Sequence, residues 1–246
     1  MSININISRT SVEMGSKAAS LIASLLRDAV KENGSARIIL STGQSQFEMF
    51  DALVKQDVPW NKVEMFHLDE YVNLPISHKA SFRKYLNERF VSKVDLKAAY
   101  FVDGEGNVDE NIAFLTKKLG ERPVDVGVIG IGENGHIAFN DPPADFDATE
   151  AYRVVNLDLR CRMQQVGEGW FETVDDVPKQ AISMLPGQIM KCRSIVSVVP
   201  HSVKAEAVFN TITKPVDPMV PATLLKTHSN WNLFLDDASA ALLLSR

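Results

Sequence analysis

Two side chains near the middle of the sequence, His136 and Asp141, have the types and spacing expected of a proton-transfer site. They follow an apolar run over residues 126–131 and a turn that contains three glycines. An imidazole titrates near neutral pH and can act as a general acid or base. A histidine at a strand end is often only a hydrogen-bonded structural residue, but the neighbouring carboxylate favours chemistry. We therefore expect a site around His136.

The glycines of this turn, Gly130, Gly132 and Gly135, have the spacing of a dinucleotide-binding fingerprint. That fingerprint requires an uninterrupted helix after the glycines, whereas Pro142 and Pro143 follow here. The glycines are expected instead to let the backbone approach a ligand closely. No nucleotide or other cofactor is predicted.

A second candidate for proton transfer is Asp69, which precedes Glu70 and follows the strand predicted at 62–66. Adjacent side chains point in different directions, so one carboxylate can face a ligand while the other braces a loop. Asp69 is the candidate general base. The alternative is that one or both carboxylates are solvated turn residues.

A polar turn at residues 41–45 follows a short buried strand predicted at 37–40 and precedes a helix predicted over 47–54. Its hydroxyls and free backbone N–H groups would favour an anion, most naturally a phosphate. An ordinary turn with Ser and Thr as helix caps would have the same composition. The residues of this turn are Ser41, Thr42, Gly43, Gln44 and Ser45.

Three basic residues could add charge to such a phosphate site. Lys204 lies in the first turn of a helix predicted to follow the strand 194–200, where its charge opposes the helix dipole. A negative ligand would compensate for that charge, although a solvated lysine is the alternative. Arg160 and Arg162 belong to a polar segment that could form a mobile lid at about 145–175, or an exposed helix.

The elements that must position these residues alternate between strands and helices. This alternation predicts one α/β domain over residues 1–246, with a doubly wound, mostly parallel, Rossmann-like sheet and helices on both faces. The carboxyl ends of its strands would bring the polar segments to one edge. Strands are expected at 3–8, 37–40, 62–66, 126–131, 151–155, 194–200 and 232–236, and helices at 11–33, 47–54, 81–90, 108–119 and 201–212.

The composition limits the partners. A net charge of −5 and a pI near 5.6 provide no basic field for nucleic acid, and no run of apolar residues is long enough for a membrane span. The first residues lack the layout of a signal peptide, so we expect a cytoplasmic protein, monomeric or homo-oligomeric. The two cysteines do not form a C-x-x-C pair, and no metal site is predicted.

Two strings make the sequence resemble a known family. Asp69-Glu70-Tyr71-Val-Asn-Leu74 and Gly135-His136-Ile-Ala-Phe-Asn140 resemble the glucosamine-6-phosphate deaminase (isomerase) family, within the superfamily that includes 6-phosphogluconolactonases. The resemblance extends through Ser41-Thr-Gly43, Val177-Pro-Lys179 and Lys204, over nearly the whole chain. Tyr71 and the Phe139-Asn140 pair favour the deaminase branch over the lactonases.

The resemblance implies a metal-free conversion of an amino sugar 6-phosphate, most simply glucosamine 6-phosphate, into fructose 6-phosphate and ammonia. It implies that Asp69 moves a proton between C2 and C1, and that His136, partnered by Asp141, assists opening of the sugar ring. It further implies that the 41–45 turn and Lys204 hold the phosphate.

The sequence departs from the family pattern at three places. Asn134 stands where the family usually has Asp, and Asp141 stands where it usually has the longer Glu. The phosphate-binding arginine of the family has no clean counterpart, so Arg160 or Arg162 would substitute. These departures leave the sugar open between glucosamine and galactosamine 6-phosphate. The rival functions are a 6-phosphogluconolactonase-like hydrolase and a non-catalytic sugar-phosphate sensor.

Overall fold

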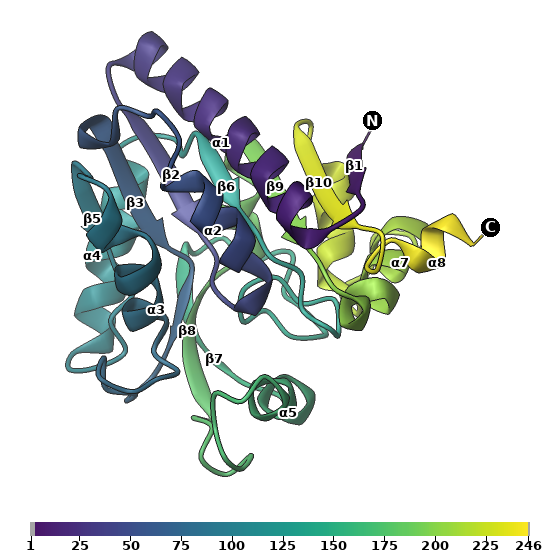
Figure 1. The fold of residues 1–246 in the computed structure, drawn as a ribbon. Coiled ribbons are helices and arrows are strands. Elements are labelled where there is room, and N and C mark those ends of the chain that lie inside the picture. Colours follow the sequence, from purple (N-terminus) through teal and green to yellow (C-terminus); the bar gives the residue numbers. More distant parts are fainter. Residues whose placement is uncertain (1–2, 246) are drawn as a thin grey trace.

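The computed structural model describes residues 3–245, and its centre is a seven-stranded parallel sheet (Figure 1). The strand order is β1-β10-β9-β6-β2-β3-β5, and every neighbouring pair is parallel. The predicted α/β class and mostly parallel sheet are therefore confirmed. The strands are β1 (Asn4–Ser8), β2 (Ala36–Leu40), β3 (Val63–His67), β5 (Ala98–Tyr100), β6 (Val126–Val128), β9 (Ser194–Val199) and β10 (Trp231–Asp236).

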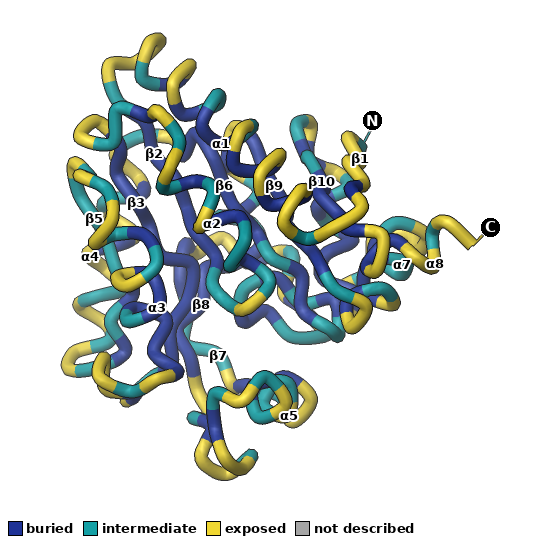
Figure 2. The backbone as a smooth tube through the Cα atoms, in the orientation of Figure 1, coloured by how far each residue is buried: buried dark blue, intermediate teal, exposed yellow. Residues whose placement is uncertain are grey.

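Helices cover both faces of this sheet, and each face has its own apolar core. All residues of β2, β3 and β9 are buried, as the dark central strands of Figure 2 show. Burial on both faces explains why most residues of these segments are apolar. One face packs against α1 (Ser11–Asn33), α2 (Phe47–Leu53) and α3 (Phe82–Arg89), and the other against α4 (Val108–Gly120), α6 (Pro186–Ile189) and α7 (Ala205–Thr213).

A second, three-stranded antiparallel sheet extends from the main one, at the bottom of Figure 1. Its strands are β4 (Asp69–Tyr71), β8 (Gln180–Met184) and β7 (Tyr152–Asn156), in that order. Helix α5 (Leu159–Gly167) lies between β7 and β8 in the chain and packs on a small core that includes Tyr71, Cys161 and Phe171. The strand expected at 151–155 is present, but it belongs to this second sheet.

One predicted strand is shorter than expected. The apolar run 126–131 was expected to be extended throughout, whereas β6 ends at Val128. The Ile129 N–H still donates to the Val196 carbonyl at 3.0 Å, after which the chain leaves the sheet for the glycine turn. The apolar side chains of Ile129 and Ile131 are nevertheless buried, which is why hydrophobicity alone misplaced the strand end.

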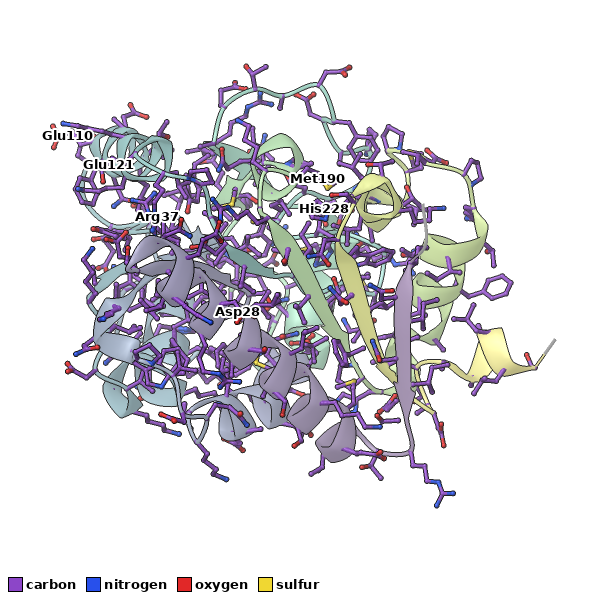
Figure 3. All side chains as sticks on the ribbon, turned by 90° about the horizontal axis from the view of Figure 1, so that it is seen from above. Asp28, Arg37, Glu110, Glu121, Met190 and His228 are labelled. Carbon is purple, nitrogen blue, oxygen red and sulfur yellow. The ribbon has the colours of Figure 1, made fainter. Side chains whose placement is uncertain are left out.

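The amino end of the central strands is occupied by a structural charge network. Arg37 is 3 % exposed, donates to Glu64 at 2.9 Å and to the Arg122 carbonyl at 2.7 Å, and lies 3.4 Å from Glu121. Figure 3 views this end and labels Arg37 and Glu121, the residue that follows α4. These paired charges hold the end of α4 in place. The amino end of the strands thus has a structural role, and the opposite edge of the sheet is open to a ligand. None of the helices described between residues 3 and 245 is long and apolar enough to cross a membrane.

Candidate active site

A cavity of about 600 Å³ opens at the carboxyl ends of the central strands. It flanks β2 and β6, the neighbouring strands from which the chain order runs in opposite directions, which is where open α/β sheets bind ligands. Most of the residues singled out from the sequence line this one cavity. They are Ser41, Thr42, Gly43, Gln44, Ser45, Asp69, His136, Arg160 and Lys204.

The glycine turn after β6 shapes the position of His136. The Gly132 N–H donates to the His136 carbonyl at 2.9 Å, and the Gly135 N–H donates to the Gly132 carbonyl at 3.0 Å. Gly135 has a φ of 85°, which side chains rarely tolerate. A Cβ on Gly132 would lie only 2.2 Å from Cε1 of the His136 ring. The glycine spacing that resembles a dinucleotide-binding fingerprint therefore leaves room for the imidazole ring of His136.

His136, Asp141 and Asn134 form one polar cluster. Nδ1 of His136 lies 3.3 Å from Oδ1 of Asp141, which is ion-pair distance, although this buried nitrogen has no well-aligned hydrogen bond. The Asn134 side chain donates to the same Oδ1 at 3.1 Å and accepts the His136 N–H at 3.0 Å. Asn134 and Asp141 do not line the cavity themselves, so they act on a ligand only through His136.

Asp141 is held in its ionised form despite its burial. Burial alone would raise the pKa of this carboxyl, but the neighbouring His136 and the hydrogen bonds from Asn134 and the Asp158 N–H together lower the pKa below its usual value. The Asp158 N–H belongs to the start of α5 and donates to Oδ2 at 3.2 Å. Helix α5 therefore touches the carboxylate behind His136. Within residues 3–245, one group of potential metal ligands occurs, formed by His136, Asp141 and Cys161.

Asp69 and Glu70 face different surroundings, as alternation predicts. They lie in β4 of the second sheet, one residue beyond Leu68, rather than at the terminus of β3. Asp69 lines the cavity and is 5 % exposed. Burial, and secondarily the nearby Glu70, raise the pKa of Asp69 well above its usual value, against a smaller opposing effect of the Phe139 amide. Such a carboxylate is a stronger base than an exposed one once it is ionised.

Glu70 braces the following loop. Its carboxylate accepts hydrogen bonds from the Ser81 hydroxyl and the Arg83 N–H, both at 2.9 Å, and from the Tyr71 N–H at 3.0 Å. Burial raises the pKa of Glu70, while these hydrogen bonds lower it. Asp69 thus faces the cavity while Glu70 braces the loop, and whether Asp69 acts on a ligand stays a prediction.

The polar turn after β2 presents an unpartnered group. Ser41 is buried, and its Oγ has no hydrogen-bond partner among the described residues. Gly43 adopts a φ of 102°, and its carbonyl accepts from the Tyr85 hydroxyl at 2.8 Å. Helix α2 has seven residues and begins after a short 3-10 turn at Gln44–Gln46, so hydroxyls matter more here than a helix dipole.

Lys204 brings the positive charge to this turn. It is 6 % exposed, lines the cavity, and has no carboxylate within ion-pair distance among residues 3–245. Burial lowers the pKa of its ammonium, and the negative charges of Glu168 and Glu133 partly oppose that shift. A buried cation without an ion partner is costly, and an anionic ligand would relieve the cost.

The two arginines of α5 are in different places. Arg160 is exposed and lines the cavity. Arg162 donates to the Val174 carbonyl and lies 3.9 Å from Asp175, so the structure does not bring it to the cavity. They are two positions apart in a helix and therefore cannot share a face.

Several cavity residues were not anticipated from the sequence. Glu168 and His201 are the clearest: Glu168 is held by Gln164 at 2.7 Å and Trp170 at 3.0 Å, and its carbonyl accepts from Gln44 at 2.8 Å. His201 has a φ of 77°, a strained backbone in which its N–H reaches both oxygens of Asp236 at 3.1 Å. The position of His201 at a strand end was the only available signal. Glu133, Gln164 and Gln165 also line the cavity.

Fold and cavity together define a class: an α/β protein with a small-molecule site at the switch point of a parallel sheet, equipped for proton transfer on an anionic ligand. Residues 9–234 match the family described as glucosamine-6-phosphate isomerases/6-phosphogluconolactonase, and the chain belongs to this family.

Individual relatives and solved structures are similar to this chain over nearly its whole length. The chain is 31 % identical over 242 residues to a glucosamine-6-phosphate deaminase from Oenococcus oeni, covering 98 % of this chain and 99 % of that protein. A solved monomeric glucosamine-6-phosphate deaminase superposes with a TM-score of 0.88 at 26 % identity, covering 97 % of this chain and 99 % of the other. A 6-phosphogluconolactonase from Shewanella baltica gives 0.78 at 18 % identity, over 96 % and 98 % of the chains, which shows a shared fold.

Proposed function

We propose that the protein is a hexosamine-6-phosphate deaminase that converts glucosamine 6-phosphate into fructose 6-phosphate and ammonia. The observation that supports it most is the meeting, in one cavity, of a buried carboxylate of raised pKa, a histidine backed by a carboxylate, and a hydroxyl-rich turn beside a buried lysine. The identity to curated deaminases over nearly the whole chain supports the same reaction.

The reaction begins with opening of the sugar ring. Nδ1 of His136 faces Asp141, which leaves Nε2 for the ligand. As a neutral imidazole, Nε2 accepts the proton of the C1 hydroxyl and returns a proton to the ring oxygen. Asp141 stabilises the transient imidazolium because its own pKa is low. The product of this step is the open-chain aldehyde.

Asp69 then moves the proton that defines the isomerisation. Its carboxylate removes the proton from C2, giving an enediol-like intermediate with the amino group still attached. The same carboxyl returns the proton to C1, which leaves an imine at C2. Water hydrolyses this imine to the ketone and ammonia. One base that serves both carbons must lie close to both, and a buried strand position such as Asp69 in β4 is rigid enough for this.

The phosphate occupies the other end of the cavity. The unpartnered Ser41 hydroxyl, the rest of the 41–45 turn and the Lys204 ammonium provide its hydrogen bonds and charge. Arg160 supplies a second cation from α5, and residues 145–175 act as a lid that carries Arg160 over the ligand. The enzyme works in the cytoplasm on a free small molecule, without a role for nucleic acid.

Parallel assays with glucosamine 6-phosphate and galactosamine 6-phosphate test this proposal, with ammonia and ketose phosphate measured together. Equal release of both products from one sugar, abolished in Asp69→Asn, is the expected result and identifies the substrate. Absence of ammonia from both sugars would overturn the proposal. A lactone substrate would then separate a hydrolase from a sugar-phosphate sensor that only binds.

A further inference from the structure

The Cys161 side chain lies next to His136 and Asp141, behind the cavity. The Sγ atom of Cys161, one ring nitrogen of His136 and a carboxylate oxygen of Asp141 all lie within 4.8 Å of one another, and Nδ1 is the ring nitrogen that lies 3.3 Å from Asp141. Cys161 comes from the first turn of α5, whereas the other two come from the loop after β6. Two segments distant in the sequence therefore place a thiol, an imidazole nitrogen and a carboxylate around one point.

The three atoms are suited to a thiophilic cation. Cys161 is 1 % exposed, and its thiol has the Asp141 carboxylate as a hydrogen-bond partner. Nδ1 of His136 is buried without an aligned hydrogen bond and lies 3.3 Å from the same carboxylate. Zinc sites use this mixture of S, N and O donors with ligand atoms roughly 3.5 Å apart, which small side-chain rotations would reach here. Three protein ligands leave a fourth position for water.

We propose that Cys161, His136 and Asp141 form an inhibitory binding site for a divalent cation such as Zn²⁺. On binding, the Cys161 thiol loses its proton to solvent and a metal–sulfur bond forms, while Nδ1 and Asp141 coordinate through lone pairs. No oxidation or reduction takes place, and the cation has no part in the forward reaction.

The inhibition follows from the chemistry of the imidazole and rests on the proposed role of His136. A cation on Nδ1 forces the remaining ring proton onto Nε2, which faces the cavity. Nε2 can then no longer accept the proton of the sugar hydroxyl. The cation also joins α5 to the loop after β6, so it would hold the helix against the site.

Neighbouring charges favour the cation. Asp158, at the start of α5, has its Oδ1 on the Cys161 N–H at 2.6 Å and its own N–H on Asp141 at 3.2 Å. Its carboxylate therefore lies beside Cys161, although it is not one of the three clustered ligand groups. The nearby Arg162 is directed to the Val174 carbonyl and Asp175. The site thus has a second carboxylate beside it, and Arg162 is paired elsewhere.

Cobalt provides the direct test on the purified protein, without substrate. Co²⁺ added to wild type should give a thiolate charge-transfer absorption with a stoichiometry of one per chain. Cys161→Ser and Cys161→Ala should lose this absorption and bind Co²⁺ more than about tenfold more weakly, since even outer-shell changes have effects of that size. Cys192→Ser is the matched control, because Cys192 is also buried and free but lies outside the cluster.

Inhibition of the enzyme by Zn²⁺ is the second measurement. The ratio of rates with and without Zn²⁺ should fall in wild type and in Cys192→Ser, and should stay unchanged in Cys161→Ser whatever its basal rate. A wild-type protein without the cobalt–thiolate absorption would overturn the proposal. So would an absorption that survives in both Cys161 variants. Because the cobalt signal needs no turnover, it fails or succeeds separately from the proposed reaction.

Discussion

The ring of His136 occupies the space where a side chain on Gly132 would be. A Cβ at Gly132 would approach Cε1, Nε2 and Cδ2 of the imidazole at 2.2, 2.3 and 2.5 Å, which no real contact allows. The ring and the glycine are also linked through the backbone, since the Gly132 N–H donates to the His136 carbonyl at 2.9 Å. The position of the histidine thus depends on a residue four places earlier that has no side chain.

Gly132→Ala should therefore damage activity more than stability. The added methyl group must displace the imidazole from the cavity wall, so we expect kcat to fall by about 100-fold, as for a misplaced catalytic group. The free energy of unfolding should drop by only about 1–3 kcal/mol, the usual cost of overpacking. Gly120→Ala is the control, because a Cβ there has nothing within 4 Å and should leave kcat unchanged. Equal kcat values for the two variants would refute this role of Gly132.

Asp69→Asn should remove activity and raise stability. We expect a loss of about 10²–10⁴-fold in kcat, the usual contribution of a general base. The folded pKa of Asp69 is raised, so its ionisation opposes folding: wild type loses stability as the pH rises through that folded pKa. The amide cannot ionise and avoids this loss.

Thermal unfolding of wild type and Asp69→Asn at acidic and neutral pH would check the sign. The variant should be the more stable protein at neutral pH, with a smaller difference in acid. Asp95→Asn, at an exposed position, controls for the change in net charge. A variant less stable than wild type at neutral pH would show that burial does not strain this carboxylate.

Most of the main sheet was predictable, because its segments are mainly apolar and are separated by amphipathic helices. No strand was expected at β5, which has only three residues. The strand ends then indicated where Ser41, Asp69, His136 and Lys204 would gather. The second sheet was not predictable in the same way. Its strand β4 has only three residues, and its partner β8 lies more than 100 positions later, so no local pattern marks the pairing.

The two arginines of α5 show a second limit of prediction from the sequence. Arg160 and Arg162 are equally plausible from composition, and only the rotation of α5 about its axis decides which one faces the cavity. That rotation is set by tertiary contacts, such as Cys161 in the small core and the Asp158 N–H on Asp141. The position of Glu168 in the cavity wall depends on the same packing of α5.

Asn134→Asp tests what the amide contributes. The Nδ2 group that donates to Asp141 at 3.1 Å would become a carboxylate oxygen at the same distance. Two carboxylates this close cannot both ionise freely, so the pKa of Asp141, which the Asn134 amide helps to lower in wild type, should rise in the variant. We expect the acid limb of the pH–activity profile to move up by roughly one unit. The measurement is kcat/KM against pH, with Asn87→Asp on the exposed surface as control. Superimposable profiles would mean that Asn134 serves only the turn.

Lys204→Met tests the phosphate end of the cavity. A hydrogen bond to a charged group contributes about 1.5–3 kcal/mol, so KM for the sugar phosphate should rise about 10–100-fold. Without ligand, the variant should be more stable than wild type, because it removes a buried ammonium whose pKa burial lowers. Lys31→Met, at an exposed position, should change neither quantity.

The two readings of Lys204→Met together separate a binding residue from a structural one. A ligand-binding lysine predicts weaker substrate binding and higher stability in the same protein, and loss of the stabilisation that added inorganic phosphate gives to wild type. A lysine that holds the fold together predicts lower stability with an unchanged KM. Because no carboxylate in the described chain lies within ion-pair distance of Lys204, the structure favours the first result.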